Sequence, residues 1–206
     1  MTQIQKLDML LALYIAAIVC AELLGSKIFT LFGINASVAI FIFPLTFTIN
    51  DVVSEVCGKE RARSFVRSGF IMLFFLFAYT FLATILPPAA RFQNINESYG
   101  NLFRSSLRII VASLTAFWVS ERLDVFIFYK IREKFGKKRL WLRNNLSNFI
   151  GQFVDTSVFM FLAFYIPGNA LFVISLIVPY WILKCVFSII ETPFAYLGIQ
   201  WLNTEK

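Results

Sequence analysis

Residues 36–58 read ASVAIFIFPLTFTINDVVSEVCG, an apolar run as long as a membrane span that carries Asp51 and Glu55 towards its end. A helix needs about 20 consecutive apolar residues to cross the hydrocarbon core of a bilayer. A charged side chain at the centre of such a helix costs about 2.5–3.5 kcal/mol on insertion scales, so such charges face a protein interior. The stretch therefore predicts a transmembrane helix with one polar, inward-directed face.

Similar apolar runs fill most of the chain. Of its 206 residues, 59% are hydrophobic, which exceeds the usual share in soluble domains. We expect six transmembrane helices, at about 7–31, 36–57, 68–87, 107–129, 146–166 and 170–200. The stretch 88–106 is polar and predicts a long loop, and Pro167-Gly168-Asn169 predicts a tight turn. The predicted fold class is an all-α membrane protein. We expect a six-helix transmembrane bundle, residues 1–206 as a single domain, with helix two kinked at Pro44 and helix six kinked at Pro179 and Pro193.

Basic residues gather in two of the predicted connections. The second contains Lys59, Arg61, Arg63 and Arg67, and the fourth contains Lys130, Arg132, Lys134, Lys137, Lys138, Arg139 and Arg143. Because basic loops stay in the cytoplasm, both connections are predicted to be cytoplasmic, and both termini with them. The net charge of +7 therefore reflects membrane orientation, and we expect no nucleic-acid partner.

The composition excludes several kinds of site. Histidine is absent, which removes the commonest transition-metal ligand and the usual general base near neutral pH. The three cysteines, Cys20, Cys57 and Cys185, lie apart in apolar segments and form neither a disulfide framework nor a CxxC pair. We expect no metal and no cofactor. The first apolar run is too long for a cleaved signal peptide and is interpreted as a retained span.

Charged residues in the predicted spans are mostly acidic. Seven carboxylates (Glu22, Asp51, Glu55, Glu121, Asp124, Asp155 and Glu191) accompany two cations, Arg122 and Lys184. Full ionisation would leave five negative charges unpaired in a medium of low dielectric constant, which is costly. The excess indicates a cavity that binds protons or a ligand rich in N–H donors.

The polar residues follow helical spacing. Asp51 and Glu55 are four apart beside Asn50, and Glu121 and Asp124 are three apart, so each pair shares a helix face. The fifth helix carries a stripe of Asn148, Gln152 and Asp155, extended by Asn144 and Asn145. The sixth carries Trp181, Lys184, Ser188 and Glu191. Carboxylates that accept paired N–H groups, amides that read a carbonyl and nearby aromatic rings suit a flat, guanine-like heterocycle. The alternative for each stripe is a structural role in which polar side chains hold helices together.

Several of these strings are similar to a known family. NDVVSEVCG at 50–58, LWLRNN at 140–145, QFVDT at 152–156, and Lys184 with ETP at 191–193 resemble the queuosine precursor transporter family, also known as the vitamin uptake transporter family. The resemblance implies a multi-pass bacterial inner-membrane protein of six helices that imports 7-deazaguanine bases or queuine for tRNA modification. It implies that Asp51, Glu55, Arg143, Asn145, Gln152, Asp155 and Lys184 occupy motif positions. The last motif more usually has Asp where Glu191 stands, which leaves the preferred substrate open.

The candidate substrate-binding residues are therefore Asn50, Asp51, Glu55, Glu121, Arg122, Asp124, Arg143, Asn145, Asn148, Gln152, Asp155, Trp181, Lys184 and Glu191. The leading hypothesis is a proton-coupled secondary transporter of a small heterocycle, surrounded by lipid and capable of forming a homo-oligomer.

Two other classes stay open. A membrane subunit that captures substrate for separate ATPases is one, because Ala12 with Ala16 and Ala17 with Ala21 would allow a close partner helix. An intramembrane aspartic protease built on Asp124 and Asp155 is the other, although the Gly-x-Gly-Asp string is missing. We expect no enzymatic activity.

Overall fold

The structure is a computed structural model of the chain and describes the backbone of residues 1–31, 34–135 and 140–204. Side chains are described over the same ranges except at 31, 34, 121–122, 124–135, 140–148, 188–189 and 192. The chain divides into two compact units, and each is described by itself. Unit 1 comprises Met1–Leu107 and Leu183–Lys206, and unit 2 comprises Arg108–Ile182. The single functional domain stays a prediction.

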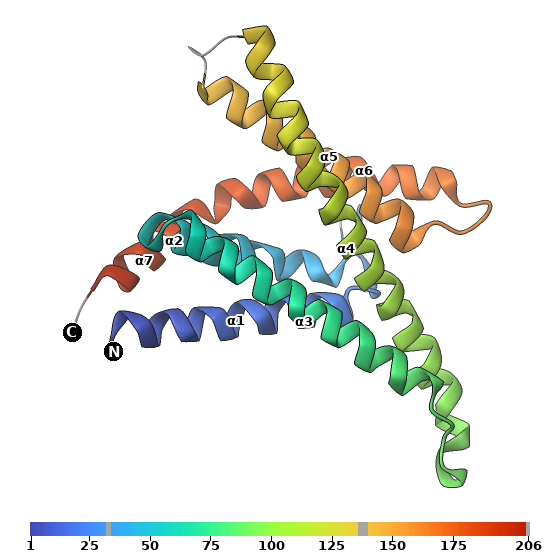
Figure 1. The fold of residues 1–206 in the computed structure, drawn as a ribbon. Coiled ribbons are helices and arrows are strands. Elements are labelled where there is room, and N and C mark those ends of the chain that lie inside the picture. The colour runs from blue at the N-terminus through green and yellow to red at the C-terminus, as the bar shows by residue number, and fades with distance from the viewer. Residues whose placement is uncertain (32–33, 136–139, 205–206) are drawn as a thin grey trace. The chain divides into compact units, whose positions relative to one another are not determined.

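Helices dominate the described chain (Figure 1). Within the described residues, five stretches are long and apolar enough to cross a bilayer, namely Gln3–Leu24, Val38–Cys57, Lys59–Ile85, Ala90–Ser120 and Ala170–Phe187. A shorter apolar helix covers Phe149–Phe164. The chain is an all-α membrane protein, as predicted, apart from one short hairpin. The count of six spans, their kinks and the side of the membrane on which the termini lie stay predictions.

Unit 1 contains most of the elements. In chain order they are α1 (Gln3–Leu24), β1 (Ile28–Leu31), β2 (Ile34–Ser37), the 3-10 turn η1 (Val38–Phe41), α2 (Phe43–Cys57), α3 (Lys59–Ile85), the 3-10 turn η2 (Ala90–Phe92), the start of α4 (Gln93–Phe135), the end of α6 (Ala170–Ile190) and α7 (Thr192–Asn203). The hydroxyl of Thr2 caps α1 by accepting from the Gln5 backbone, and the Gln5 side chain caps in return.

The first helix is shorter than predicted, because residues 28–37 form an antiparallel hairpin that pairs Ile28 with Ser37. Gly25 ends α1 where a Cβ would come within 2.4 Å of the Ala21 carbonyl oxygen. The first strand begins with Ile28, Phe29 and Thr30, residue types that favour strands over helix. The Ser37 hydroxyl donates to the Gly25 carbonyl at 2.7 Å, which fastens the second strand to the end of α1.

Two predicted connections are helical instead. The basic segment 59–67 forms the start of α3, where an exposed Glu60–Arg63 ion pair at 2.5 Å supports the first turn. The predicted loop 88–106 is mostly the beginning of α4. Its polar residues recur at helical spacing. The rings of Tyr99 and Phe103, one turn apart, are in contact, with their centroids 4.5 Å apart. Both predictions of a loop were wrong for the same reason. The two segments are as polar as loops, but their residues also follow the spacing of a helix.

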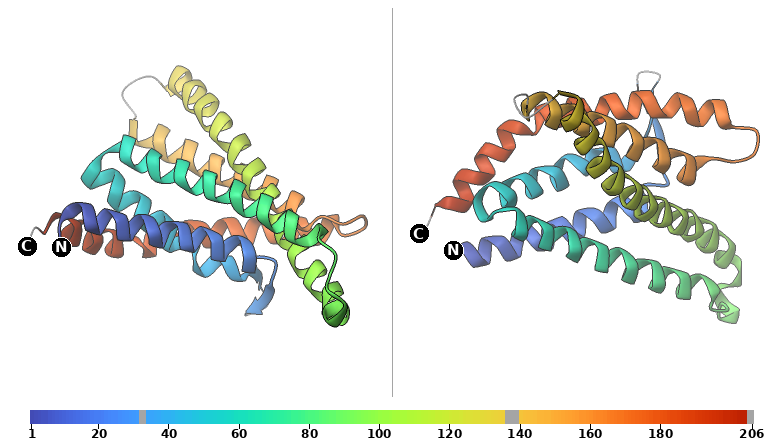
Figure 2. Two further views of the ribbon diagram at one scale, coloured as in Figure 1. Left: turned by 60° about the horizontal axis from the view of Figure 1, so that its bottom comes forward. Right: turned by 45° about the horizontal axis from the view of Figure 1, so that its top comes forward.

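The core of unit 1 lies where α1, α2, α3 and α7 meet. It consists of buried apolar side chains, namely Leu7, Tyr14, Ile49, Val52, Val53, Ala62, Phe65 and Leu202. Lys6, only 5% exposed, joins the two ends of the chain by donating to the carbonyls of Trp201 and Thr204. The termini therefore lie together, at the same end of unit 1 as the basic α2–α3 junction (Figure 1 and Figure 2).

A glycine sets the approach of α7 to α2. A Cβ at Gly198 would come within 2.7 Å of Val52 Cγ2, whereas a Cβ at Gly100 would meet nothing within 4 Å. Val52 is buried and rotates little about χ1, so Gly198→Ala is expected to destabilise unit 1 by about 1–3 kcal/mol through overpacking. Thermal unfolding in detergent checks this, with Gly100→Ala as the matched control. Equal melting temperatures for the two variants would contradict it.

Unit 2 contains the rest of α4, α5 (Leu140–Phe164) and most of α6. Ile109 and Ala112 of α4 pack against Ala163 of α5. Arg108 caps the end of α5, its Nε donating to the Leu162 carbonyl at 2.8 Å and its guanidinium to the Tyr165 carbonyl. The turn into α6 lies where predicted, with Gly168 at φ +96°.

Candidate functional site

Helix α2 presents the first group of candidate residues. Pro44, predicted to kink this span, lies in the first turn of α2, where its missing N–H costs nothing, and Gly58 at φ +83° ends the helix. The side-chain oxygen of Asn50 is buried and accepts no hydrogen bond from the described residues. The carboxylates of Asp51 and Glu55 are exposed within unit 1.

Glu191 stands at a junction between two helices. The predicted sixth helix is divided here, because α6 ends at Ile190 and α7 begins at Thr192, with Pro193 in its first turn. Backbone hydrogen bonds still cross the junction, from the Glu191 N–H to the Phe187 carbonyl and from the Ala195 N–H to the Glu191 carbonyl, both 2.9 Å. The side chain of Glu191 is only 5% exposed.

The junction lies against α2. The Thr48 hydroxyl donates to Glu191 Oε2 at 3.4 Å, and Asp51 is close enough for the two carboxylates to repel each other. Lys184, two turns before Glu191, lies with Nζ 5.6 Å from the centre of the Phe43 ring, a cation–π contact. The start of α2 thus meets Lys184 and its later turns meet Glu191, so the two segments run in the same direction.

We call Thr48, Asp51 and Glu191 the unit 1 polar cluster. Two neighbouring carboxylates of like charge are stable when a proton, a cation or an N–H donor lies between them. The Asn50 oxygen, buried without a donor among the described residues, lies about 200° around α2 from Thr48 and is a separate acceptor. The cluster can therefore hold a proton or a ligand that presents several N–H groups. The cation of Lys184 lies on the same segment, seven residues before Glu191.

Unit 2 holds a second group of candidate residues. On α5, Gln152 and Asp155 are three apart, and the Ser120 hydroxyl of α4 lies 3.4 Å from Asp155 Oδ1 as a donor. The indole of Trp181 on α6 lies edge-on to the rings of Phe149 and Phe153, with centroid distances of 6.4 and 5.5 Å. Its Nε1–H is buried without an acceptor among the described residues. A ligand with an acceptor atom could bond this donor.

The remaining six candidate residues are outside the described side chains. They are Glu121, Arg122, Asp124, Arg143, Asn145 and Asn148. Among the side chains that are described, no three or more Asp, Glu or Cys are grouped to hold a metal ion.

One residue of the unit 1 polar cluster was not among the candidates from the sequence. The Thr48 hydroxyl donates to Glu191, 143 residues away, a bond that joins two helices. The available signal is its spacing, because it lies one turn before Asp51 on α2. Phe43, which contacts Lys184, has no such signal among the many phenylalanines.

Comparisons with known proteins found a family and several relatives. The profile of a family described as "Putative vitamin uptake transporter" matches residues 37–198. The chain is 32% identical over 191 residues to a probable queuosine precursor transporter of Bacillus subtilis, covering 92% of this chain and 83% of that protein.

Two further curated relatives are more distant. A probable queuosine precursor transporter of Haemophilus influenzae is 28% identical over 65% of this chain and 54% of its own length. The queuosine precursor transporter of Escherichia coli is 26% identical over 68% of this chain and 61% of its own length. The chain thus spans little more than half the length of these two relatives. No solved structure matches the chain.

Proposed function

We propose, from the premise that this chain belongs to the vitamin uptake transporter family, that it imports a queuosine precursor, a 7-deazaguanine base or queuine. The chain is a multi-pass protein of the bacterial inner membrane. The observation that carries the proposal is the relative that covers 92% of the chain and is named for this transport. The unit 1 polar cluster supports it, because a membrane protein keeps a buried carboxylate such as Glu191 where it acts on a ligand or a proton.

The chemistry of the base suits the polar residues. A guanine-like ring presents adjacent N–H groups on one edge, which a carboxylate accepts in a bidentate manner. Asp51, Glu55 and Asp155 are assigned to that edge or to proton transfer. Gln152 and Asn148 are assigned to the polar edges of the ring, and Lys184 balances the negative charge. Binding of the ring's N–H groups would relieve the repulsion between Asp51 and Glu191.

Uptake in a defined strain tests the proposal. Bacteria that cannot synthesise queuosine precursors and lack their own importer should accumulate a labelled 7-deazaguanine base only when they express this chain. Competition by the unlabelled nitrile precursor, the aminomethyl precursor, queuine and guanine then ranks the substrates. No uptake of any of the deazaguanines by a well-expressed protein would overturn the proposal.

Proton coupling follows from the excess of carboxylates. If protons drive accumulation, a protonophore that collapses the proton gradient should reduce the steady-state accumulation of the labelled base to its external concentration. Exchange of internal for external base at equilibrium should continue, because exchange needs no net driving force. Accumulation that is unchanged by the protonophore would contradict coupling while leaving the transport function intact.

A further inference from the structure

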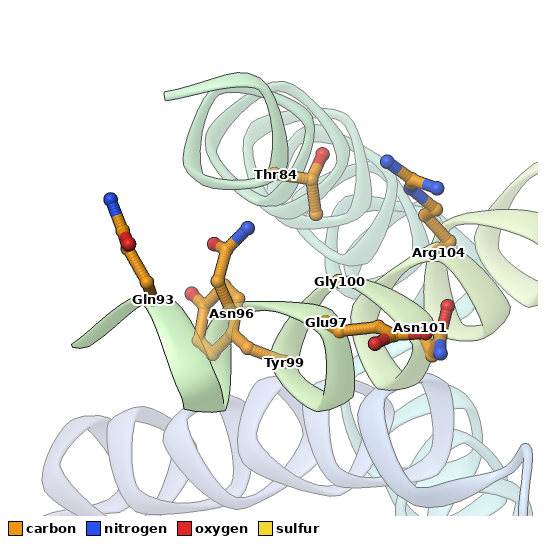
Figure 3. A pocket seen from close by; sticks show the side chains of 8 residues that line it. All are labelled: Thr84, Gln93, Asn96, Glu97, Tyr99, Gly100, Asn101 and Arg104. Atoms are coloured by element: carbon orange, nitrogen blue, oxygen red, sulfur yellow. The ribbon is translucent and has the colours of Figure 1, made fainter. Parts of the chain in front are cut away.

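A polar pocket lies at the far end of unit 1 from the chain termini. It forms between the end of α3 and the first three turns of α4, with a volume of about 280 Å³ (Figure 3). Thr84 lines it from α3. From α4, Asn96, Glu97, Asn101 and Arg104 line it around Gly100. We call this site the outer pocket.

The outer pocket is made from one face of α4. Its lining residues follow the spacing of three and four that brings side chains to one side of a helix. Asn96, Glu97, Asn101 and Arg104 are exposed, and none of their side chains hydrogen-bonds another group in the described part of the chain. They offer two amides, a carboxylate and a guanidinium to a ligand. Gly100 leaves room beside them, since a Cβ there would meet nothing within 4 Å.

The pocket's place in the membrane follows from α3. Its first turns carry exposed basic residues, which the positive-inside rule keeps in the cytoplasm. A helix of 27 residues is about 40 Å long, enough to cross the bilayer, so its other end emerges on the outer side. Thr84 and the start of α4 are at that end. The outer pocket therefore faces the side from which substrate arrives.

We propose that the outer pocket is an entry site that captures the free base before it reaches the residues within the membrane. This inference rests on the proposed function. The Glu97 carboxylate accepts the paired N–H groups of an amino-lactam ring, and the Arg104 guanidinium donates to the ring's carbonyl or nitrogen acceptors. The two side chains are seven residues apart, about 10 Å along the helix axis, so a fused two-ring base can lie between them.

The size of the pocket suits a small ligand. Small-molecule sites usually have volumes of about 300–1,000 Å³, and the outer pocket lies just below that range. It is therefore large enough for a free base. An acid or a simple cation would use only one of the two charged groups, whereas an amino-lactam heterocycle uses both.

Gly100→Leu tests the pocket by filling it. The new side chain enters open space, and leucine favours the helix more than glycine, so the variant should fold. Loss of one charge-assisted hydrogen bond costs about 1.5–3 kcal/mol, which is at least about tenfold in affinity. We expect Gly100→Leu, Glu97→Gln and Arg104→Gln each to raise the KM for uptake of the labelled base by about tenfold or more. The maximal rate should change by less than about twofold, because transfer across the membrane uses other residues.

Two control variants are matched to these changes. Arg91→Gln removes an exposed cation of η2 that does not line the pocket, and Gly100→Ala adds only a methyl group. Both should keep the KM of the unaltered protein. Unaltered KM in Gly100→Leu, Glu97→Gln and Arg104→Gln, with normal uptake by the parent protein, would overturn the entry site alone. Absence of uptake by the parent protein would overturn the proposed function as well.

Discussion

Uptake of the labelled base is expected to fall at least about 30-fold when Glu191 is replaced by glutamine. The buried carboxylate lies at the α6–α7 junction, within reach of the Thr48 hydroxyl and the charge of Asp51. Glutamine keeps the shape and can still accept from Thr48, but it neither carries a proton nor pairs with two N–H groups of a ring. If Glu191 accepts two N–H groups of the base, each bond to the charged carboxylate contributes about 1.5–3 kcal/mol, so weakening both costs more than about 2 kcal/mol, which is at least about 30-fold.

Two control variants make this result specific. Glu191→Asp keeps the carboxylate and restores the residue that the family motif more usually has, so uptake should stay within a few-fold of the unaltered protein. Glu60→Gln makes the same chemical change at an exposed ion pair and should have no effect on uptake. Uptake at the normal rate by well-expressed Glu191→Gln protein would exclude the carboxylate from the transport mechanism.

Asp155→Asn is expected to abolish uptake. If Asp155 accepts two N–H groups of the base, each bond to the charged carboxylate contributes about 1.5–3 kcal/mol, so losing both costs at least about 100-fold. Asparagine replaces one acceptor oxygen with an N–H₂ group, which opposes the donors of the ring. The Ser120 hydroxyl can still bond the remaining oxygen, so α4 and α5 should stay together.

The Asp155 result is checked by initial rates of uptake at several concentrations of base, together with the amount of protein in the membrane. Asp8→Asn provides the control, because Asp8 is exposed on the first turns of α1. Ser120→Ala should reduce uptake less than Asp155→Asn, since it removes one hydrogen bond and no charge. Normal uptake by Asp155→Asn would remove α5 from the proposed binding site.

The helical segments were predictable because their apolar runs are long, as in 36–57 and 170–190. The residues at which those helices end were not predictable. The hairpin at 28–37 depends on the close approach at Gly25, and the helical start of α4 depends on contacts such as that between Tyr99 and Phe103. Composition assigned both segments wrongly, because apolar β-branched residues occur in membrane helices as well as in strands, and polar residues occur in helices as well as in loops. The residues at which a helix ends and the chain turns back are only weakly indicated by the sequence.

The candidate site was predictable within each helix and not between helices. The spacing of Asp51 on α2 and of Lys184 with Glu191 on the last segment indicated which faces are polar. That these two faces meet follows from packing of α7 on α2, which depends on Gly198 and Val52. No pattern in one sequence identifies such a pair. Thr48 becomes part of the site only because the partner helix brings Glu191 to it.

Unit 1 combines the beginning and the end of the chain, which has a consequence for biogenesis. Its core includes Leu202, and the ammonium of Lys6 donates to the carbonyls of residues 201 and 204. The first helix to be synthesised therefore completes its contacts only after the last helix has been made. At about 5–20 residues per second, synthesis of the intervening chain takes roughly 10–40 seconds. During that time the charge of Lys6 lacks its final acceptors. A nascent chain that stalls before residue 200 would therefore leave Lys6 without these acceptors and the core of unit 1 without Leu202.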